Sequence, residues 1–158
     1  MRIAGFDLAT TSGCAVLDGT RVIHAAAFRP AGKTDAEIFT GFRKWFRGVL
    51  IGFDIQHVGI EQALVTDIRA PVSGPDARPG ETRNPVTMKT YLRLYGLRAH
   101  AVQICGRLNV PLLEVHQATW RKSFTGNGRA SKDETLALAR RLVPGLASKD
   151  AAEAVGVA

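Results

Sequence analysis

The order of strand-like and helix-like apolar patterns along the chain is the feature that most constrains its fold. Three strand-like segments come first, at 2–8, 14–17 and 21–28, and Asp18-Gly19 between the last two is a strong hairpin signal. An amphipathic helix, a strand, a second helix, a further strand and two more helices follow. Strands and helices that alternate in this way predict an α/β protein, with one sheet and helices on both of its faces.

Both long helices are predicted from apolar residues that recur at helical spacing. The first spans 35–50, and its predicted core face is Ile38, Phe42, Trp45, Phe46 and Val49. The second spans 87–108. We expect its core face to be Leu92, Tyr95, Ala99 and Val102. Another side of the same helix carries the basic residues Lys89 and Arg93.

Shorter elements in the rest of the chain are indicated by local signals. Residues 57–63 are typical of a central strand covered on both faces, and 111–115 of a short strand. Ser131, with a glutamate three residues later, forms a capping box that starts a helix running to Leu142. We expect Ser148 to cap the last helix.

The length of 158 residues suits a single domain over 1–158. Residues 66–86 are rich in proline and glycine and show no hydrophobic period, so we expect a long mobile loop there. No apolar run is long enough to span a membrane, and no export signal is recognisable, which predicts a cytoplasmic protein without a membrane partner.

A formal net charge of +7, from 21 basic and 14 acidic residues, favours a polyanionic partner, with nucleic acid as the first candidate. Mere solubility is the alternative explanation. Around Gly126 and Gly128, cations, aromatic residues and a flexible backbone are combined, and this predicts DNA contacts at Arg121, Lys122 and Arg129. Lys89 and Arg93 extend this surface, unless they belong to a solvated helix face.

Four acidic residues stand at positions that favour catalysis: Asp7 lies on the first strand, Glu61 lies on the fourth, and Asp150 and Glu153 share one helix face. If they converge, two carboxylates about 4 Å apart repel by roughly 4 kcal/mol at an effective dielectric of 20, so cations must compensate. Oxygen ligands without histidine or cysteine favour Mg²⁺ or Mn²⁺. Two such ions activate water in phosphodiester hydrolysis. Ordinary caps or surface charges are the alternative.

Four blocks of the sequence, in order, resemble the RuvC family of Holliday-junction resolvases: "GFDLATTSG", "VGIEQA", "VPLLEVHQATWRKSFTGNGRASKDE" and "SKDAAEAVGVA". Within the third block, "WRKSFTGNG" resembles phage-type or prophage-type members more than the housekeeping bacterial enzyme. The resemblance implies an RNase H-like five-stranded mixed sheet with helices on both faces. It also implies a homodimeric, magnesium-dependent endodeoxyribonuclease that nicks opposed strands of four-way DNA junctions, with two metal ions per active site.

Carried over by position, the resemblance implies that the catalytic metal ligands are Asp7, Glu61, Asp150 and Glu153. Lys132 matches a basic residue suited to contact the phosphate near the scissile bond. Two departures from the family pattern are visible: Glu153 stands where aspartate is usual, and Leu64 stands where an aromatic residue is frequent.

Three other functions remain open from the sequence. A branched-DNA-binding protein with weak or absent turnover would explain the two departures. A related nuclease acting on forks or RNA is another candidate. "DLATTSG" also resembles the first phosphate loop of sugar kinases and actin-like ATPases, but those enzymes need a second domain, for which this chain is too short.

Overall fold

Five strands form one mixed sheet in the order β3-β2-β1-β4-β7. The computed structural model describes residues 1–62, 70–71, 82–83 and 87–158. Strand β1 pairs antiparallel with β2 and parallel with β4, and β4 pairs parallel with β7. The bounds of the strands are β1 Arg2–Asp7, β2 Ser12–Asp18, β3 Arg21–Phe28, β4 His57–Glu61 and β7 Leu112–Val115. The predicted hairpin is confirmed, with Gly19 in the left-handed conformation at φ 60°.

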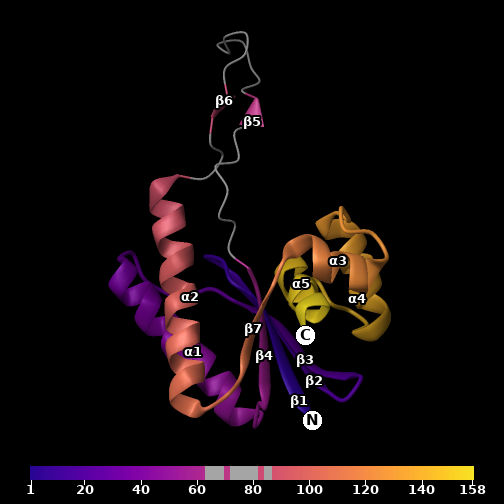
Figure 1. Ribbon diagram of the computed structural model, residues 1–158, viewed down its shortest axis with the longest axis horizontal. Helices are drawn as coiled ribbons and strands as arrows, with labels where there is room; N and C mark the ends of the chain where they lie inside the picture. The colour runs from indigo at the N-terminus through magenta and orange to yellow at the C-terminus, as the bar shows by residue number, and fades with distance from the viewer. Residues whose placement is uncertain (63–69, 72–81, 84–86) are drawn as a thin grey trace.

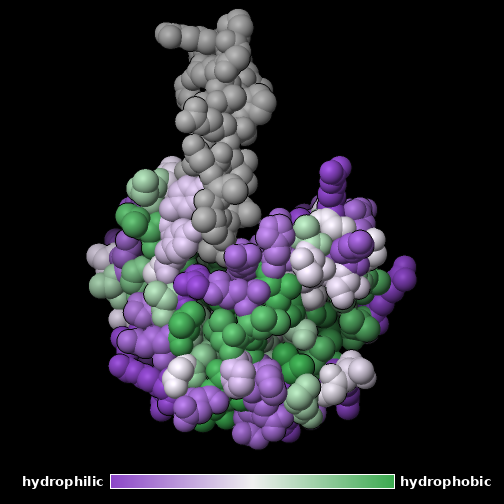
Figure 2. Space-filling view, viewed as in Figure 1, coloured by the Kyte–Doolittle hydropathy of each residue, from purple (hydrophilic) through white to green (hydrophobic). Residues whose placement is uncertain are grey.

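Helices cover both faces of this sheet, as predicted (Figure 1). Two long helices lie on one side, α1 (Asp35–Gly52) and α2 (Met88–Leu108). On the other side lie α3 (Gln117–Thr125), α4 (Lys132–Leu142) and α5 (Lys149–Val157). In Figure 2 the hydrophobic residues gather in the middle of this view, between the two helical layers, and hydrophilic residues cover much of the periphery.

Alternate residues of the central strands face the two long helices. Ala4 and Phe6 of β1 and Ile60 of β4 are fully buried in one cluster with Phe42 and Phe46 of α1. The rings of Phe6 and Phe46 lie 4.5 Å apart between centroids. Because successive side chains of a strand point to opposite faces, Gly5, Asp7 and Glu61 belong to the face that α5 covers.

That second face is lined by glycines, which lets α5 lie directly on the strands. A Cβ added at Gly5 would come within 2.3 Å of the Ala154 carbonyl oxygen, and one at Gly13 within 1.9 Å of the Asp150 carbonyl oxygen. At Gly59 it would come within 2.7 Å of the carbonyl oxygen of Val157. A side chain at any of these three glycine positions would hold α5 away from the sheet.

The predicted caps of the last two helices are confirmed. Ser131 Oγ accepts a hydrogen bond from the Glu134 amide at 3.2 Å, and Glu134 Oε2 accepts one from the Ser131 amide at 2.7 Å. Ser148 Oγ accepts a hydrogen bond from the Ala151 amide at 3.1 Å. Residues local to each helix start thus determine where α4 and α5 begin.

The predicted core face of α2 is wrong. Three of the residues expected to point inward are well exposed: Leu92 at 65%, Val102 at 42% and Tyr95 at 39%; Ala99 is exposed as well. The buried residues are Leu97, Ala101, Ile104 and Cys105. Both sets recur at helical spacing, so α2 carries two apolar stripes, and periodicity alone does not select the one that packs on the sheet.

Helix α3 was not predicted from the sequence, which indicated only DNA contacts within 117–125. Most of the predicted 66–86 loop, together with Leu64, lies outside the described residues. Within it, β5 (Ala70–Pro71) pairs antiparallel with β6 (Thr82–Arg83). None of the helices in the described ranges is both long and apolar enough to cross a membrane.

Candidate active site

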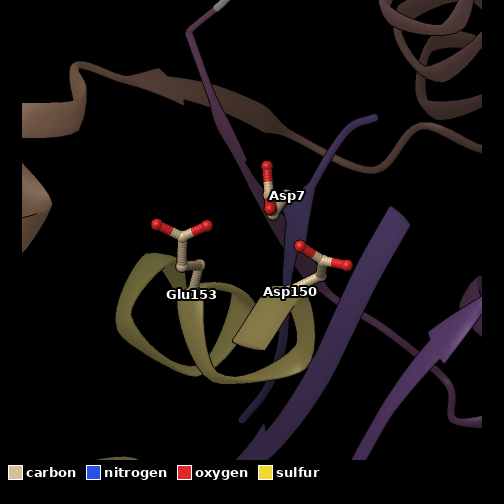
Figure 3. Close-up of side chains that lie close together, drawn as sticks. All are labelled: Asp7, Asp150 and Glu153. Atoms are coloured by element: carbon tan, nitrogen blue, oxygen red, sulfur yellow. The ribbon is translucent and has the colours of Figure 1, made fainter. Parts of the chain in front are cut away.

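Three carboxylates meet where β1 ends against the first turns of α5. Asp7, Asp150 and Glu153 each offer an oxygen, and these oxygens all lie within 4.8 Å of one another. Figure 3 shows the three side chains turned toward a common space, Asp7 from β1 and the other two from successive turns of α5. Glu153 is 2% exposed, so the cluster includes a carboxylate that has almost no contact with water.

The position of Asp7 relative to α5 follows from its strand partner. Asp7 pairs with Gly13 of β2, and it is at Gly13 that the Asp150 backbone touches the sheet. The missing side chain at Gly13 therefore brings the first turn of α5 beside Asp7. Because Glu153 follows Asp150 by three residues, both α5 carboxylates face the end of β1.

Glu61 lies beside this cluster and is held by α3. The parallel register pairs Phe6 with Ile60, so Asp7 and Glu61 follow at the same edge of the sheet. One Glu61 oxygen accepts a hydrogen bond from Gln117 Nε2 at 3.0 Å, and the other accepts one from Trp120 Nε1 at 2.9 Å. The geometry thus joins three of the four predicted acids in one group and places the fourth next to it.

Lys132 reaches into the group of three carboxylates from the start of α4. Its Nζ lies 2.5 Å from Glu153 Oε2, 3.3 Å from Asp150 Oδ1 and 4.0 Å from Asp7 Oδ2. The lysine side chain is still 48% exposed. Its ammonium group therefore compensates the carboxylates and also remains accessible to solvent.

Arg121 also belongs to this site rather than to the outer surface. It forms an ion pair with Glu153 through Nη2, and its side chain is only 14% exposed. The guanidinium carbon lies 5.2 Å from the centroid of the Trp120 ring, which is a cation–π arrangement. The sequence predicted a DNA contact at Arg121, but in this structure its charge is directed at Glu153.

Burial and crowding of like charges shift the pKa values of the group. The pKa of Asp7 is raised to about 8, first by burial and then by the negative charges of Glu61 and Glu153. Burial also raises the pKa of Glu61, although the hydrogen bond from Trp120 opposes this. For Lys132, burial disfavours the charged form, but its contacts with Glu153, Asp7 and Asp150 outweigh it and raise the pKa.

The residues present fit a hard divalent cation. Carboxylate oxygens are the ligands that Mg²⁺ and Mn²⁺ prefer, and Asp7, Asp150 and Glu153 offer three within a small space. A carboxyl whose pKa is raised by neighbouring negative charges is stabilised in its ionised form when a cation binds beside it. The site can therefore bind divalent cations at the end of β1, beside the first turns of α5.

The other predicted DNA contacts divide into two groups. Lys89, Lys122 and Arg129 are exposed. Arg93 is mostly buried and donates two hydrogen bonds to Asp35 Oδ1, at 2.6 and 2.9 Å. Arg93 therefore ties α2 to the start of α1, and its charge is compensated within the protein.

The sequence reasoning missed the role of Gln117 and Trp120 as partners of Glu61. The two residues are three positions apart, which places them on one face of a helix. The signal that could have found them is a pair of side-chain donors at helical spacing directly after the strand that neighbours β4. The Trp120 side chain is only 2% exposed, so it is part of the buried core as well as a partner of Glu61.

Comparison with known sequences gives a partial match. No protein-family model matches the chain. The crossover junction endodeoxyribonuclease RuvC of Rickettsia akari is 35% identical over 72 residues, which is 44% of this chain and 46% of that protein. The match thus spans less than half the length of this curated relative.

Comparison with solved structures extends the likeness to the whole chain. Thermus thermophilus RuvC in complex with a Holliday junction substrate superimposes with a TM-score of 0.75 at 14% identity, over 100% of this chain and 90% of that one. The yeast mitochondrial Holliday junction resolvase gives 0.59 at 8% identity, over 98% and 76%. The chain therefore has the fold of RuvC, a five-stranded mixed sheet with helices on both faces, as the resemblance of its motifs implied. The likeness to phage-type members stays a prediction.

Proposed function

We propose that this RuvC-like chain is a divalent-metal-dependent endonuclease that hydrolyses phosphodiesters in four-way DNA junctions. The observation that carries the proposal is the meeting of Asp7, Asp150 and Glu153 at one edge of the sheet, in a chain of net charge +7. Carboxylates gathered in this number suit a metal, and the excess of positive charge suits a polyanionic substrate. The RuvC fold and the partial identity to RuvC support the same substrate class.

The proposed roles follow from the contacts of each residue. Asp7, Asp150 and Glu153 hold Mg²⁺ or Mn²⁺, and Glu61, fixed by Gln117 and Trp120, completes the acidic edge. Two bound ions, the number predicted from the sequence, would supply an activated water and charge stabilisation for the leaving oxygen.

Lys132 acts on the DNA side of the site. Its partly exposed Nζ lies among the carboxylates, and it offers positive charge to a phosphate oxygen when DNA approaches. The exposed cations Lys89, Lys122 and Arg129 bind the phosphate backbone farther away.

A homodimer is part of the proposal. Cutting two opposed strands of one junction needs two active sites, and the described residues of this chain form one cluster of this kind. The outer stripe of α2, made of Met88, Leu92, Tyr95 and Val102, is exposed and apolar at helical spacing. Such a stripe suits packing against the same stripe of a second copy.

A single domain over 1–158 and a cytoplasmic location remain predictions from the sequence.

The test is incubation of synthetic four-way, forked and linear duplexes with the protein in Mg²⁺, Mn²⁺ or Ca²⁺. We expect the four-way junction to be cut in Mg²⁺ and Mn²⁺. Asp7→Asn should abolish cutting and preserve junction binding, because it removes a metal ligand without changing the shape of the side chain. Cutting that survives in Asp7→Asn would refute the site.

Asp54→Asn is the matched control. Asp54 is exposed, lies before the start of β4 at the end opposite Glu61, and has a φ of 54° that asparagine also adopts. We expect this variant to cut like the unaltered protein.

If the unaltered protein cuts forked duplexes in preference to four-way junctions, it is a nuclease with another branched substrate.

A binding protein without turnover is the second candidate, and one observation favours it. Both carboxylate oxygens of Glu153 face cations of the chain itself, Arg121 and Lys132. Junction binding in Ca²⁺ without cutting in Mg²⁺ or Mn²⁺ would support this function over the nuclease.

A further inference from the structure

Arg121 is a charge built into the acidic site. Its guanidinium group is mostly buried, pairs with Glu153 and lies against the Trp120 ring. Its Nε is buried and has no hydrogen-bond partner among the described residues. An arginine remains charged at any pH at which proteins are folded, so this positive charge is permanent.

The positive charge of Arg121 reduces the net negative charge that the site can offer to metal ions. Four carboxylates, Asp7, Glu61, Asp150 and Glu153, carry four negative charges when all are ionised. Lys132 and Arg121 compensate two of these. The remaining formal charge is about −2 with Lys132 in place and about −3 once Lys132 is displaced, and either value is smaller in magnitude than the +4 of two divalent ions.

The oxygens of the two glutamates are also engaged. Glu153 faces Arg121 with one oxygen and Lys132 with the other. Glu61 accepts one hydrogen bond on each oxygen, from Gln117 and Trp120. A second ion would therefore have to compete with contacts that the protein already makes.

The two cations differ in how readily they can leave. Lys132 is 48% exposed, and its flexible stem allows the ammonium group to move out into solvent when an ion binds. Arg121 is 14% exposed, and the ring that it contacts is itself tied to Glu61. An incoming ion thus displaces Lys132 more easily than Arg121.

We propose that Arg121 is a resident counter-cation of Glu153 that keeps a second divalent ion out of the DNA-free protein. The inference rests on the metal site of the proposed function. It assigns Arg121 a positioning role: the chain alone takes up one ion, and the second enters only when a DNA phosphate adds negative charge.

The test counts Mn²⁺ ions bound by the protein without DNA, by isothermal titration calorimetry. We expect one ion per chain in the unaltered protein. In Arg121→Gln, a second ion should bind, with an affinity at least tenfold higher than any second ion shows in the unaltered protein. Arg121→Lys retains the charge and should bind one ion.

Arg47→Gln is the matched control for charge. Arg47 is exposed on α1, on the other side of the sheet, and its loss should leave the number of ions at one. Thermal unfolding of each variant shows whether the fold is retained. The count in the unaltered protein needs no variant, so two ions of similar affinity there would refute the inference even if Arg121→Gln does not fold.

Two results would overturn the inference: two ions of similar affinity in the unaltered protein, or an unchanged ion count and affinity in folded Arg121→Gln. Failure of the proposed function gives a different pattern. In that case the unaltered protein would bind no Mn²⁺, or Asp7→Asn would bind it as tightly as the unaltered protein.

Discussion

At the scale of single residues, Asp7 combines burial with the greatest crowding of negative charge. Its pKa is raised to about 8, so without a metal ion it is mostly protonated in the folded protein at neutral pH. In the unfolded chain the pKa of the same group is near its ordinary value of 3.8. Between these two values the folded state binds more protons than the unfolded state, and stability must fall as the pH rises.

Asp7→Asn tests this linkage, since asparagine is neutral at every pH and of similar shape. In the presence of a chelator, we expect the variant to gain stability over the unaltered protein as the pH rises from 5 to 8. The gain is limited to about 4 kcal/mol, from about 1.4 kcal/mol per unit of pH. Urea unfolding at both pH values measures it. A stability difference that is equal at pH 5 and pH 8 would contradict the raised pKa.

At the scale of elements, the contact between α5 and the glycine-lined face determines where the carboxylates meet. The helix is short, with nine residues, and its backbone touches the strands at Gly5, Gly13 and Gly59. A helix that sits this close carries its side chains directly over the end of β1. The approach of α5 is therefore as important to the site as the acidic residues themselves.

Gly13→Ala should move α5 and separate its carboxylates from Asp7, because the new Cβ would lie 1.9 Å from the Asp150 carbonyl oxygen. We expect a loss of about 1–3 kcal/mol in the free energy of unfolding and weaker Mn²⁺ binding. Calorimetric titration and urea unfolding measure the two effects.

Gly48→Ala is the control for this substitution. Gly48 lies in α1 with no atom within 4 Å of an added Cβ, so alanine should be neutral or stabilise by up to about 1 kcal/mol. If Gly13→Ala binds Mn²⁺ as tightly as the unaltered protein, the close approach of α5 to β2 is not needed for the metal site, and the prediction is wrong.

At the scale of the whole molecule, the two apolar stripes of α2 have separate roles. One stripe packs on the sheet through Leu97 and Ala101, and the other remains exposed. We proposed that a second copy covers the exposed stripe. An apolar surface used for association is expected to matter for assembly and little for the stability of one chain.

Leu92→Glu should convert the dimer to a monomer, because it places a charge in the middle of the exposed stripe, where the leucine is 65% exposed. Sedimentation velocity measures the change, and circular dichroism checks that the fold is retained. Ile51→Glu alters a residue of similar exposure, 52%, on α1 and should leave the dimer intact. A monomeric unaltered protein, or a dimer that persists in Leu92→Glu, would exclude this interface.

Much of the architecture could be predicted from local patterns. The Asp18-Gly19 turn, the capping box at Ser131 and the cap at Ser148 act within a few residues, so they can be recognised from the sequence alone. Helix α3 was missed because its one buried residue, Trp120, produces no apolar stripe. The core face of α2 was assigned wrongly because two stripes of the same helix satisfy the same spacing.

Apart from α3, the sequence by itself determined the types of the main sheet strands and helices, their order and the acidic residues on them, since these depend on propensities and contacts between near neighbours. Only the tertiary structure decided that Glu61 is held by α3, that Arg121 faces Glu153 and that α5 rests on Gly5, Gly13 and Gly59. The physical reason is distance along the chain. These contacts join residues more than thirty positions apart, and whether they form depends on how closely whole elements can pack.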